Sequence, residues 1–176
     1  KSGDIISVDV GAKFDGWHGD AARTFLIGDV APEVQALVRV TRECFYEGMK
    51  HARAGNRLFD ISAAIQAHAE RHGYGVVRSL VGHGIGRNLH EPPDVPNYMP
   101  QRMGRGTRLV AGMTLAVEPM INMGVADVNL LDDQWTVVTK DGLPSAHYEN
   151  TIAITDDAPL LLTCTQEEHC SEGEQP

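Results

Sequence analysis

The sequence predicts one α+β domain in which helices pack against one face of a largely antiparallel sheet. Its 176 residues are 42% hydrophobic and 22% charged, which is ordinary for a folded domain with its own core. The expected elements occur in the order strand, strand, helix, helix and then four strands, which favours this architecture. No apolar run approaches the length needed to cross a bilayer, so we expect no membrane partner.

The chain opens with a predicted hairpin. Residues 4–10 alternate around β-branched side chains, as is typical of a strand. Residues 14–16 contain an Asp-Gly pair, which is a strong turn signal. Residues 22–27 are expected to form the returning strand.

Two helices are expected next. Apolar side chains recur at helical spacing over residues 34–54, after Pro32, which suits a first helical position, and before Gly55, which ends the run. A second apolar stripe over residues 61–72 ends at Gly73 and predicts the second helix.

The second half of the chain predicts strands around one long loop. Residues 76–81 indicate a short apolar strand, and residues 82–106, rich in Gly and Pro, indicate a long ordered loop of functional importance. Further strands are expected over residues 113–117, 135–139, 147–155 and 160–162. We place a catalytic domain over residues 1–163 and an acidic, disordered tail over residues 164–176.

The charge and the cysteines exclude several classes of function. The net charge of −9 argues against direct nucleic-acid binding, which needs clustered Lys and Arg, and it suits a cationic ligand such as a free α-amino group. Cys44, Cys164 and Cys170 match no zinc-binding spacing. We interpret them as free thiols in a reducing cytoplasm, with Cys44 buried in a helix.

Three carboxylates lie in or beside apolar strands. Asp9 lies between Val8 and Val10, Glu118 ends one apolar run and Glu149 opens another. A buried carboxylate is costly unless it is paired or binds a metal. Any one of them is more simply a solvent-facing or capping side chain, but three in separate strands indicate a shared cation.

Two further residues complete this set. Asp20 follows Asp9 across the predicted turn, so the hairpin can return its carboxylate alongside the first. His83 lies between two glycines, which let the backbone approach a ligand closely, although alone it would indicate only an incidental loop histidine. Four carboxylates and one imidazole suit divalent Mn, Fe, Co or Zn, and in particular two ions that share bridging carboxylates. Because no thiolate is involved, a structural zinc site is disfavoured.

His90 follows His83 in the same Gly- and Pro-rich segment. An imidazole beside the metals would be able to hydrogen-bond a substrate carbonyl or a tetrahedral intermediate. Spacing alone leaves the alternative of an ordinary surface histidine open.

Five short motifs, in order along the chain, resemble the metal-site motifs of type I methionine aminopeptidases. They are Val8-Asp9-Val10, His18-Gly19-Asp20, residues 82–92 (GHGIGRNLHEP), residues 118–122 (EPMIN) and Tyr148-Glu149-Asn150-Thr151. Residues 133–146 are similar to a stretch of the bacterial and organellar members. The resemblance covers nearly all of residues 1–163 and implies a pita-bread fold, with two pseudo-symmetric halves around the metals.

The resemblance implies a role for each candidate ligand. Asp9 would chelate one metal ion, and His83 and Glu118 would hold the other. Asp20 and Glu149 would bridge both ions. Glu118 would also assist proton transfer from the attacking water.

The resemblance also implies the substrate and its contacts. His90 would contact the scissile carbonyl, and Trp135 and Leu89 would line the pocket for a methionine side chain. Leu89 stands where many members carry phenylalanine, and His147 stands where glutamine is common. The implied partner is the N-terminal methionine of nascent polypeptides near the ribosome, in the cytoplasm, and the full-length protein is expected to be a monomer.

Four alternatives remain beside this interpretation. An Xaa-Pro aminopeptidase or prolidase shares the fold and the five ligands, a creatinase-like hydrolase dispenses with metal, and proliferation-associated relatives bind without catalysis. Family members also carry a further N-terminal segment with a second catalytic histidine. We therefore expect this chain alone to be an incomplete domain, with Ile5, Ile6 and Phe25 exposed, and an inactive fragment is the fourth alternative.

Overall fold

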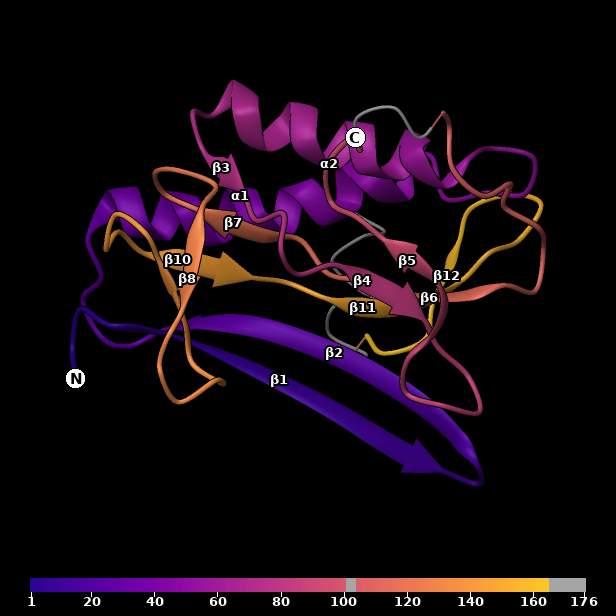
Figure 1. The fold of residues 1–176 in the computed structure, drawn as a ribbon, viewed down its shortest axis with the longest axis horizontal. Helices are drawn as coiled ribbons and strands as arrows, with labels where there is room; N and C mark the ends of the chain where they lie inside the picture. Colours follow the sequence, from indigo (N-terminus) through magenta and orange to yellow (C-terminus); the bar gives the residue numbers. More distant parts are fainter. Residues whose placement is uncertain (101–103, 165–176) are drawn as a thin grey trace.

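The helices lie together over one side of the strands, and the long first hairpin lies on the opposite side (Figure 1). The computed structural model describes residues 1–100 and 104–164. The helices are α1 (Pro32–Met49) and α2 (Leu58–Arg71). The predicted α+β architecture is confirmed.

The described strands pair antiparallel throughout. The largest sheet has the order β12-β11-β6-β4-β5, with bounds Leu160–Leu161, Asn150–Ala153, Thr114–Val117, Gly82–Gly84 and Glu91–Val95. A second sheet has the order β10-β7-β3, with bounds Ser145–His147, Met120–Asn122 and Gly75–Val76. Two separate hairpins pair β1 (Ile5–Phe14) with β2 (Trp17–Leu26) and β8 (Val128–Leu130) with β9 (Val137–Thr139).

The first hairpin forms where the sequence predicts it. Its turn contains Asp15 and Gly16, both with positive φ (46° and 80°), which is the conformation that an Asp-Gly pair favours between two strands. Both strands are longer than expected, because Gly11 and its neighbours still pair through their backbones although their side chains show no apolar alternation.

Both predicted helices are present with shifted ends. Pro32 is the first residue of α1, where its missing N–H costs nothing, and the helix ends at Met49. The second helix begins three residues earlier than expected. There the Asp60 carboxylate accepts a hydrogen bond of 2.9 Å from the Arg57 backbone N–H, which satisfies a donor at the helix start.

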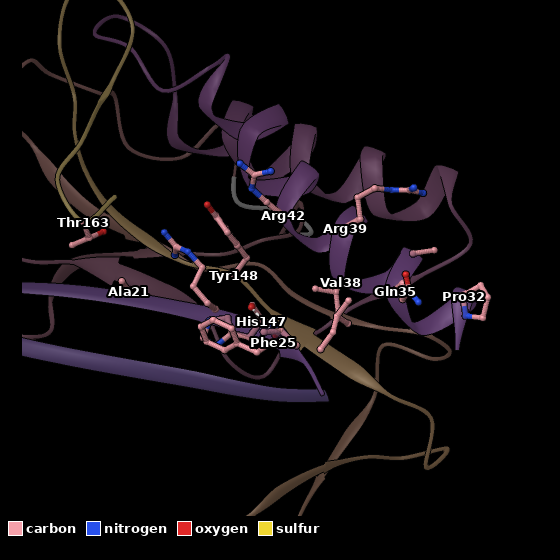
Figure 2. Close-up of a pocket in the computed structure, with 14 residues that line it drawn as sticks. Ala21, Phe25, Pro32, Gln35, Val38, Arg39, Arg42, His147, Tyr148 and Thr163 are labelled. Atoms are coloured by element: carbon pink, nitrogen blue, oxygen red, sulfur yellow. Dashed lines mark hydrogen bonds between the residues drawn. The ribbon is translucent and has the colours of Figure 1, made fainter. Parts of the chain in front are cut away.

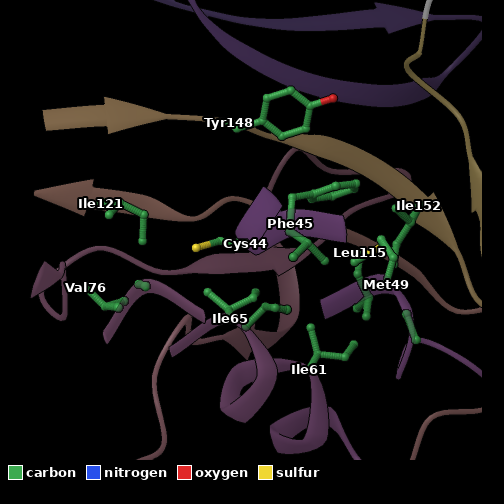
Figure 3. Packing of buried hydrophobic residues seen from close by; sticks show 14 of the residues in the cluster. Cys44, Phe45, Met49, Ile61, Ile65, Val76, Leu115, Ile121, Tyr148 and Ile152 are labelled. Atoms are coloured by element: carbon green, nitrogen blue, oxygen red, sulfur yellow. The ribbon is translucent and has the colours of Figure 1, made fainter. Parts of the chain in front are cut away.

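The main core lies between the helices and the sheets (Figure 3). Phe45 on α1 is fully buried and its ring centroid lies 5.3 Å from that of Tyr148, which precedes β11. Cys44 is buried beside it, as expected, and burial raises the pKa of its thiol to about 12. The core therefore anchors the chain between β10 and β11.

The structure corrects the prediction for the centre of the chain. The strand expected over residues 76–81 pairs only at its first residue, and the segment 82–106, expected to be a loop, contains β4 and β5. A Cβ atom at Gly82 would collide with the carbonyl oxygen of Ala116, and Gly84 is equally confined by β5. The glycines therefore permit close packing of strand backbones rather than marking a loop.

Three short strands, β7, β8 and β10, were not predicted. Each has three residues, which is too few to show an alternating pattern.

Several apolar side chains of the first hairpin are exposed. Ile6 and Phe25 are each 51% exposed, as expected, whereas Ile5 is half-buried. Of the predicted tail, all but Cys164 lies outside the described residues. None of the helices in the described part of the chain combines the length and apolar character required to span a membrane.

Candidate metal centre

Neighbouring strands of the largest sheet bring a histidine and two glutamates together. His83 lies in β4, Glu118 directly follows β6 and Glu149 directly precedes β11. Val117 pairs with Asn150 in the β6–β11 ladder, so the next position along places Glu118 opposite Glu149. Because β4 pairs with the other edge of β6, His83 comes alongside them.

The first hairpin adds Asp20 from the other side. Ala22 and Glu149 exchange two backbone hydrogen bonds of 3.4 and 2.9 Å, which fasten β2 to the start of β11. The Asp20 backbone N–H donates to the Thr151 hydroxyl oxygen at 2.8 Å, and that hydroxyl donates to the Asp20 carbonyl at 3.0 Å. These bonds hold the Asp20 side chain over the sheet residues.

The ligand atoms of this set converge on one point. Asp20, His83 and Glu149 each offer an atom within 4.8 Å of the other two. His83 Nε2 lies 3.8 Å from Asp20 Oδ2 and 3.8 Å from Glu118 Oε1. These distances exceed a hydrogen bond, yet they fit ligands around one ion whose bonds are roughly 2.0–2.2 Å long.

The orientation of His83 also suits a metal ligand. Its Nδ1 lies 2.9 Å from the carbonyl oxygen of Gly84. Since a carbonyl only accepts hydrogen bonds, Nδ1 carries the proton and Nε2 presents its lone pair to the carboxylates.

The carboxylates strongly disfavour one another's charge. Burial, and then the charges of Asp9 and Asp20, raise the pKa of Glu118 to about 8. Burial, and then the charges of Glu118, Asp20 and Asp9, raise the pKa of Glu149 to about 9. The pKa of Asp20 is also raised, first by burial and then by Asp9. A cluster of this kind is stable in its charged form only around a cation.

Two buried oxygens support the same conclusion. Asp20 Oδ1 and Glu149 Oε1 are buried and form no hydrogen bond within the described part of the protein. An oxygen in that position costs free energy unless a ligand satisfies it. The donor set, made of oxygens and one imidazole nitrogen, therefore fits divalent metal ions.

Asp9 lies at the edge of this cluster and is more exposed than the sequence indicated. It belongs to β1, which within residues 1–100 and 104–164 pairs with β2 alone, and its side chain is exposed. Asp9 is two residues from Gly11, the partner of Asp20, and therefore lies on the same face as Asp20. Its charge raises the pKa of Asp20, Glu118 and Glu149, so it is electrostatically part of the set.

His90 and Leu89 lie next to the cluster. The His90 ring centroid is 4.2 Å from that of His83, and both histidines line a cavity of about 360 Å³ with residues of β5. Leu89 is half-buried and covers Gly11 of β1, where a Cβ would lie 3.2 Å from its Cδ1 atom. His90 therefore lies against the ligand histidine, and Leu89 lies against the strand that pairs with Asp20.

Trp135 does not join this group in the structure. It lies at the turn of the β8–β9 hairpin with 86% of its surface exposed. Among the cavities described here, none includes it in its lining.

A larger cavity of about 890 Å³ separates α1 from β2 (Figure 2). Phe25, Arg42, His147 and Tyr148 contribute to its lining. It contains none of the four clustered carboxylates and is mainly apolar, so its chemistry differs from that of the metal centre.

His147 is the residue of the site to which the sequence assigned no role. It lies two residues before Glu149, and its Nε2 is 3.6 Å from Glu118 Oε2. Burial lowers the pKa of His147, which favours a neutral ring. The sequence signal that could have identified His147 is its spacing of two residues from Glu149, which along a strand places both side chains on the same face.

The raised pKa values predict how the metal-free protein responds to pH. Folded Glu118 and Glu149 retain protons up to about pH 8 and 9, whereas their ordinary pKa is 4.5. Between these values the folded state binds more protons than the unfolded state, so stability falls as pH rises. In EDTA we expect the melting temperature to fall from pH 5 to pH 9. Added Mn²⁺ should oppose this fall because the ion replaces the protons, and a melting temperature that rises with pH in EDTA would contradict the assignment.

Fold and site together define a candidate metal-binding protein, in which carboxylates and a histidine gather between a hairpin and a sheet. Residues 1–156 match the profile described as Metallopeptidase family M24. The chain belongs to this family.

Similar proteins agree with this assignment. The chain is 55% identical over 163 residues to a methionine aminopeptidase of Clostridium perfringens, covering 93% of this chain and 65% of that protein. It is 49% identical to methionine aminopeptidase 1 of Bacillus subtilis, with 93% and 65% covered. The chain thus spans slightly less than two thirds of these curated relatives.

The solved structures show the same fold. A methionine aminopeptidase of Thermotoga maritima superposes with a TM-score of 0.89 and 48% identity, over 94% of this chain and 66% of that one. The prolidase from Pyrococcus furiosus superposes with a TM-score of 0.72 at 22% identity, over 94% and 43%, which shows a shared fold alone. The expected pita-bread fold is confirmed.

Proposed function

We propose that the protein acts as a methionine aminopeptidase that removes the N-terminal methionine from nascent polypeptides. The observation that carries this proposal is the buried convergence of Asp20, His83, Glu118 and Glu149. It occurs in a chain with 55% identity to a protein named methionine aminopeptidase. The prolidase alternative shares the fold and the expected ligands, but the prolidase from Pyrococcus furiosus is only 22% identical to this chain.

The proposed ligands are the five residues expected from the sequence. Asp20 and Glu149 each have a buried oxygen without a hydrogen-bond partner among the described residues, which suits ligands shared between two ions. His83 and Glu118 would complete the ligand set of one ion. Asp9 would complete the ligand set of the other, more exposed ion. Two divalent ions, such as Co, Mn, Fe(II) or Zn, supply activation of water and polarisation of the scissile carbonyl when bound.

The protein's own side chains would move the proton and hold the substrate. Glu118, with a pKa displaced toward neutrality by its surroundings, is suited to accept a proton from the attacking water and to return it to the leaving amine. His90 lies on the cavity side of His83 and would donate a hydrogen bond to the carbonyl oxygen. The neutral His147 ring beside Glu118 limits water around that carboxylate.

The proposal extends to the partner and the place of action. The substrate's free α-amino group is cationic and would be attracted by the acidic cluster and by the net charge of −9. The same charge disfavours direct contact with nucleic acid. We place the activity in the cytoplasm on chains emerging from the ribosome, with the protein acting as a monomer and Leu89 contacting the methionine side chain.

A comparison of two peptides tests the proposed specificity. We expect cleavage of Met-Ala-Ser with added Mn²⁺ or Co²⁺ and little cleavage of an Xaa-Pro peptide, because the resemblance implies an unbranched apolar first residue and a small second one. The measurement is release of the free amino acid, with the methionine aminopeptidase of Clostridium perfringens assayed in parallel. Equal or faster cleavage of the Xaa-Pro peptide would move the protein to the prolidase branch. Activity of that relative alone would show that residues 1–176 do not suffice for catalysis.

A further inference from the structure

A second group of metal-ligand side chains lies away from the metal centre, on the helical layer. Glu43 on α1 and His68 and His72 on α2 each offer one ligand atom, and these atoms all lie within 4.8 Å of one another. The two helices lie alongside each other on the outer layer of the fold (Figure 1). We propose that this cluster is a separate site for a divalent transition metal, with Zn²⁺ as the best match, that joins α1 to α2.

Helix geometry explains why the two histidines are presented together. His68 and His72 are four residues apart, so their side chains lie on the same helix face, one turn apart. Their ring centroids are separated by 4.9 Å. Two histidines with this spacing, completed by a carboxylate from another element, form a ligand set used by zinc proteins.

The distances suit a shared ion. Glu43 Oε2 lies 3.0 Å from His68 Nε2, close to the separation of about 3.3 Å between two ligands of a tetrahedral zinc with bonds of roughly 2.0–2.1 Å. Glu43 Oε1 faces Arg39 Nε at 3.4 Å, which leaves Oε2 for the ion. His72 is exposed, so an ion would enter from solvent and keep a water in its fourth position.

Arg71 opposes metal binding at His68, and this opposition makes the proposal testable. Its Nη2 lies 2.9 Å from His68 Nδ1. The guanidinium can only donate, so Nδ1 is unprotonated and Nε2 carries the proton that is donated to Glu43. An ion bound at Nε2 requires this proton to leave, and a neutral imidazole ligand then carries its proton on Nδ1. Arg71 must therefore release His68, and its positive charge also opposes the ion.

The simpler account is that these side chains only form a hydrogen-bond network between the helices. In that case removing Arg71 would weaken the network and would create no affinity for metal. A metal site predicts the opposite response to Arg71 from the response to Glu43 and His72.

The test is a calorimetric Zn²⁺ titration of the full chain and four variants. We expect Glu43→Gln and His72→Ala each to bind one fewer equivalent, or to bind it more than about 100-fold more weakly. Arg71→Ala should bind this equivalent on the order of tenfold more tightly. His51→Ala, which removes an exposed histidine outside the cluster, should match the unaltered protein. Glu43 and His72 are both substituted so that a folding defect in one of these two variants does not decide the result.

Thermal unfolding gives a second measurement that does not depend on peptidase activity. At Zn²⁺ about one hundred times Kd, the ion should raise the melting temperature by about 5 °C more in the unaltered protein than in His72→Ala. Unchanged stoichiometry and affinity in both Glu43→Gln and His72→Ala, or weaker binding in Arg71→Ala, would overturn the proposal. The metal centre at His83 retains all its ligands in these variants, so failure here leaves the proposed function untouched.

Discussion

Glu118→Gln should lower kcat/KM for a methionyl peptide by about 10²–10⁴, the largest effect expected from a single substitution in this protein. Glutamine preserves the shape of the side chain but cannot accept a proton and carries no charge. Glu118 Oε1 lies 3.8 Å from His83 Nε2, and the pKa of Glu118 is raised to about 8. Metal coordination and proton transfer are therefore assigned to the same carboxylate. Metal affinity should fall in the same variant because one anionic ligand is lost.

Steady-state kinetics with saturating Mn²⁺, together with metal titration, separates these two losses. Glu70→Gln is a matched control, since Glu70 is exposed on α2 and its Oε1 only accepts a hydrogen bond from Gln66. If Glu118→Gln retained full turnover once saturated with metal, Glu118 would be a ligand without a part in proton transfer.

His90→Ala should reduce turnover by about 10²–10³ and leave metal binding nearly unchanged. The His90 ring lies 4.2 Å from that of His83, on the side that lines the cavity. From there it is placed to donate to a substrate oxygen rather than to coordinate an ion that His83 already faces. The change should appear mainly in kcat, because the interaction strengthens as charge develops on the carbonyl oxygen.

The measurement is the metal affinity and the kcat of His90→Ala, compared with those of His51→Ala, in which an exposed histidine remote from the cavity is removed. A His90 variant that no longer binds metal would show that His90 is a ligand and that the division of roles proposed here is incorrect.

Local sequence patterns predicted the elements that depend on nearby residues. The Asp15-Gly16 turn and the Pro32 helix start follow from backbone preferences of a few residues, and both are present. The strand β4 was missed because it pairs with β6, in which Ala116 lies 33 positions from its partner His83, and β5 was missed because it pairs with β4. Glycines that appear to mark a loop in isolation prove to be the only residues small enough for this packing.

The candidate site shows the same division. Carboxylates in apolar surroundings were recognisable at Glu118 and Glu149 because burial conflicts with their charge. The exposure of Asp9 was not recognisable, because it depends on β1 having, among the described strands, a partner along one edge and none along the other. The approach of His147 to Glu118 also depends on tertiary structure, since it requires β10 to pair with β7, which begins two residues after Glu118.

The bonds that hold Asp20 against the sheet have a consequence for the order of folding. The Asp20–Thr151 contact joins residues 131 positions apart, so it closes a loop that includes both helices and most of the strands. Forming such a loop costs entropy that only the assembled domain can recover. The metal ligands on the hairpin and on β11 therefore meet late, after the intervening chain has collapsed. High-affinity metal binding, followed in time during refolding, should then report completion of the native topology rather than its beginning.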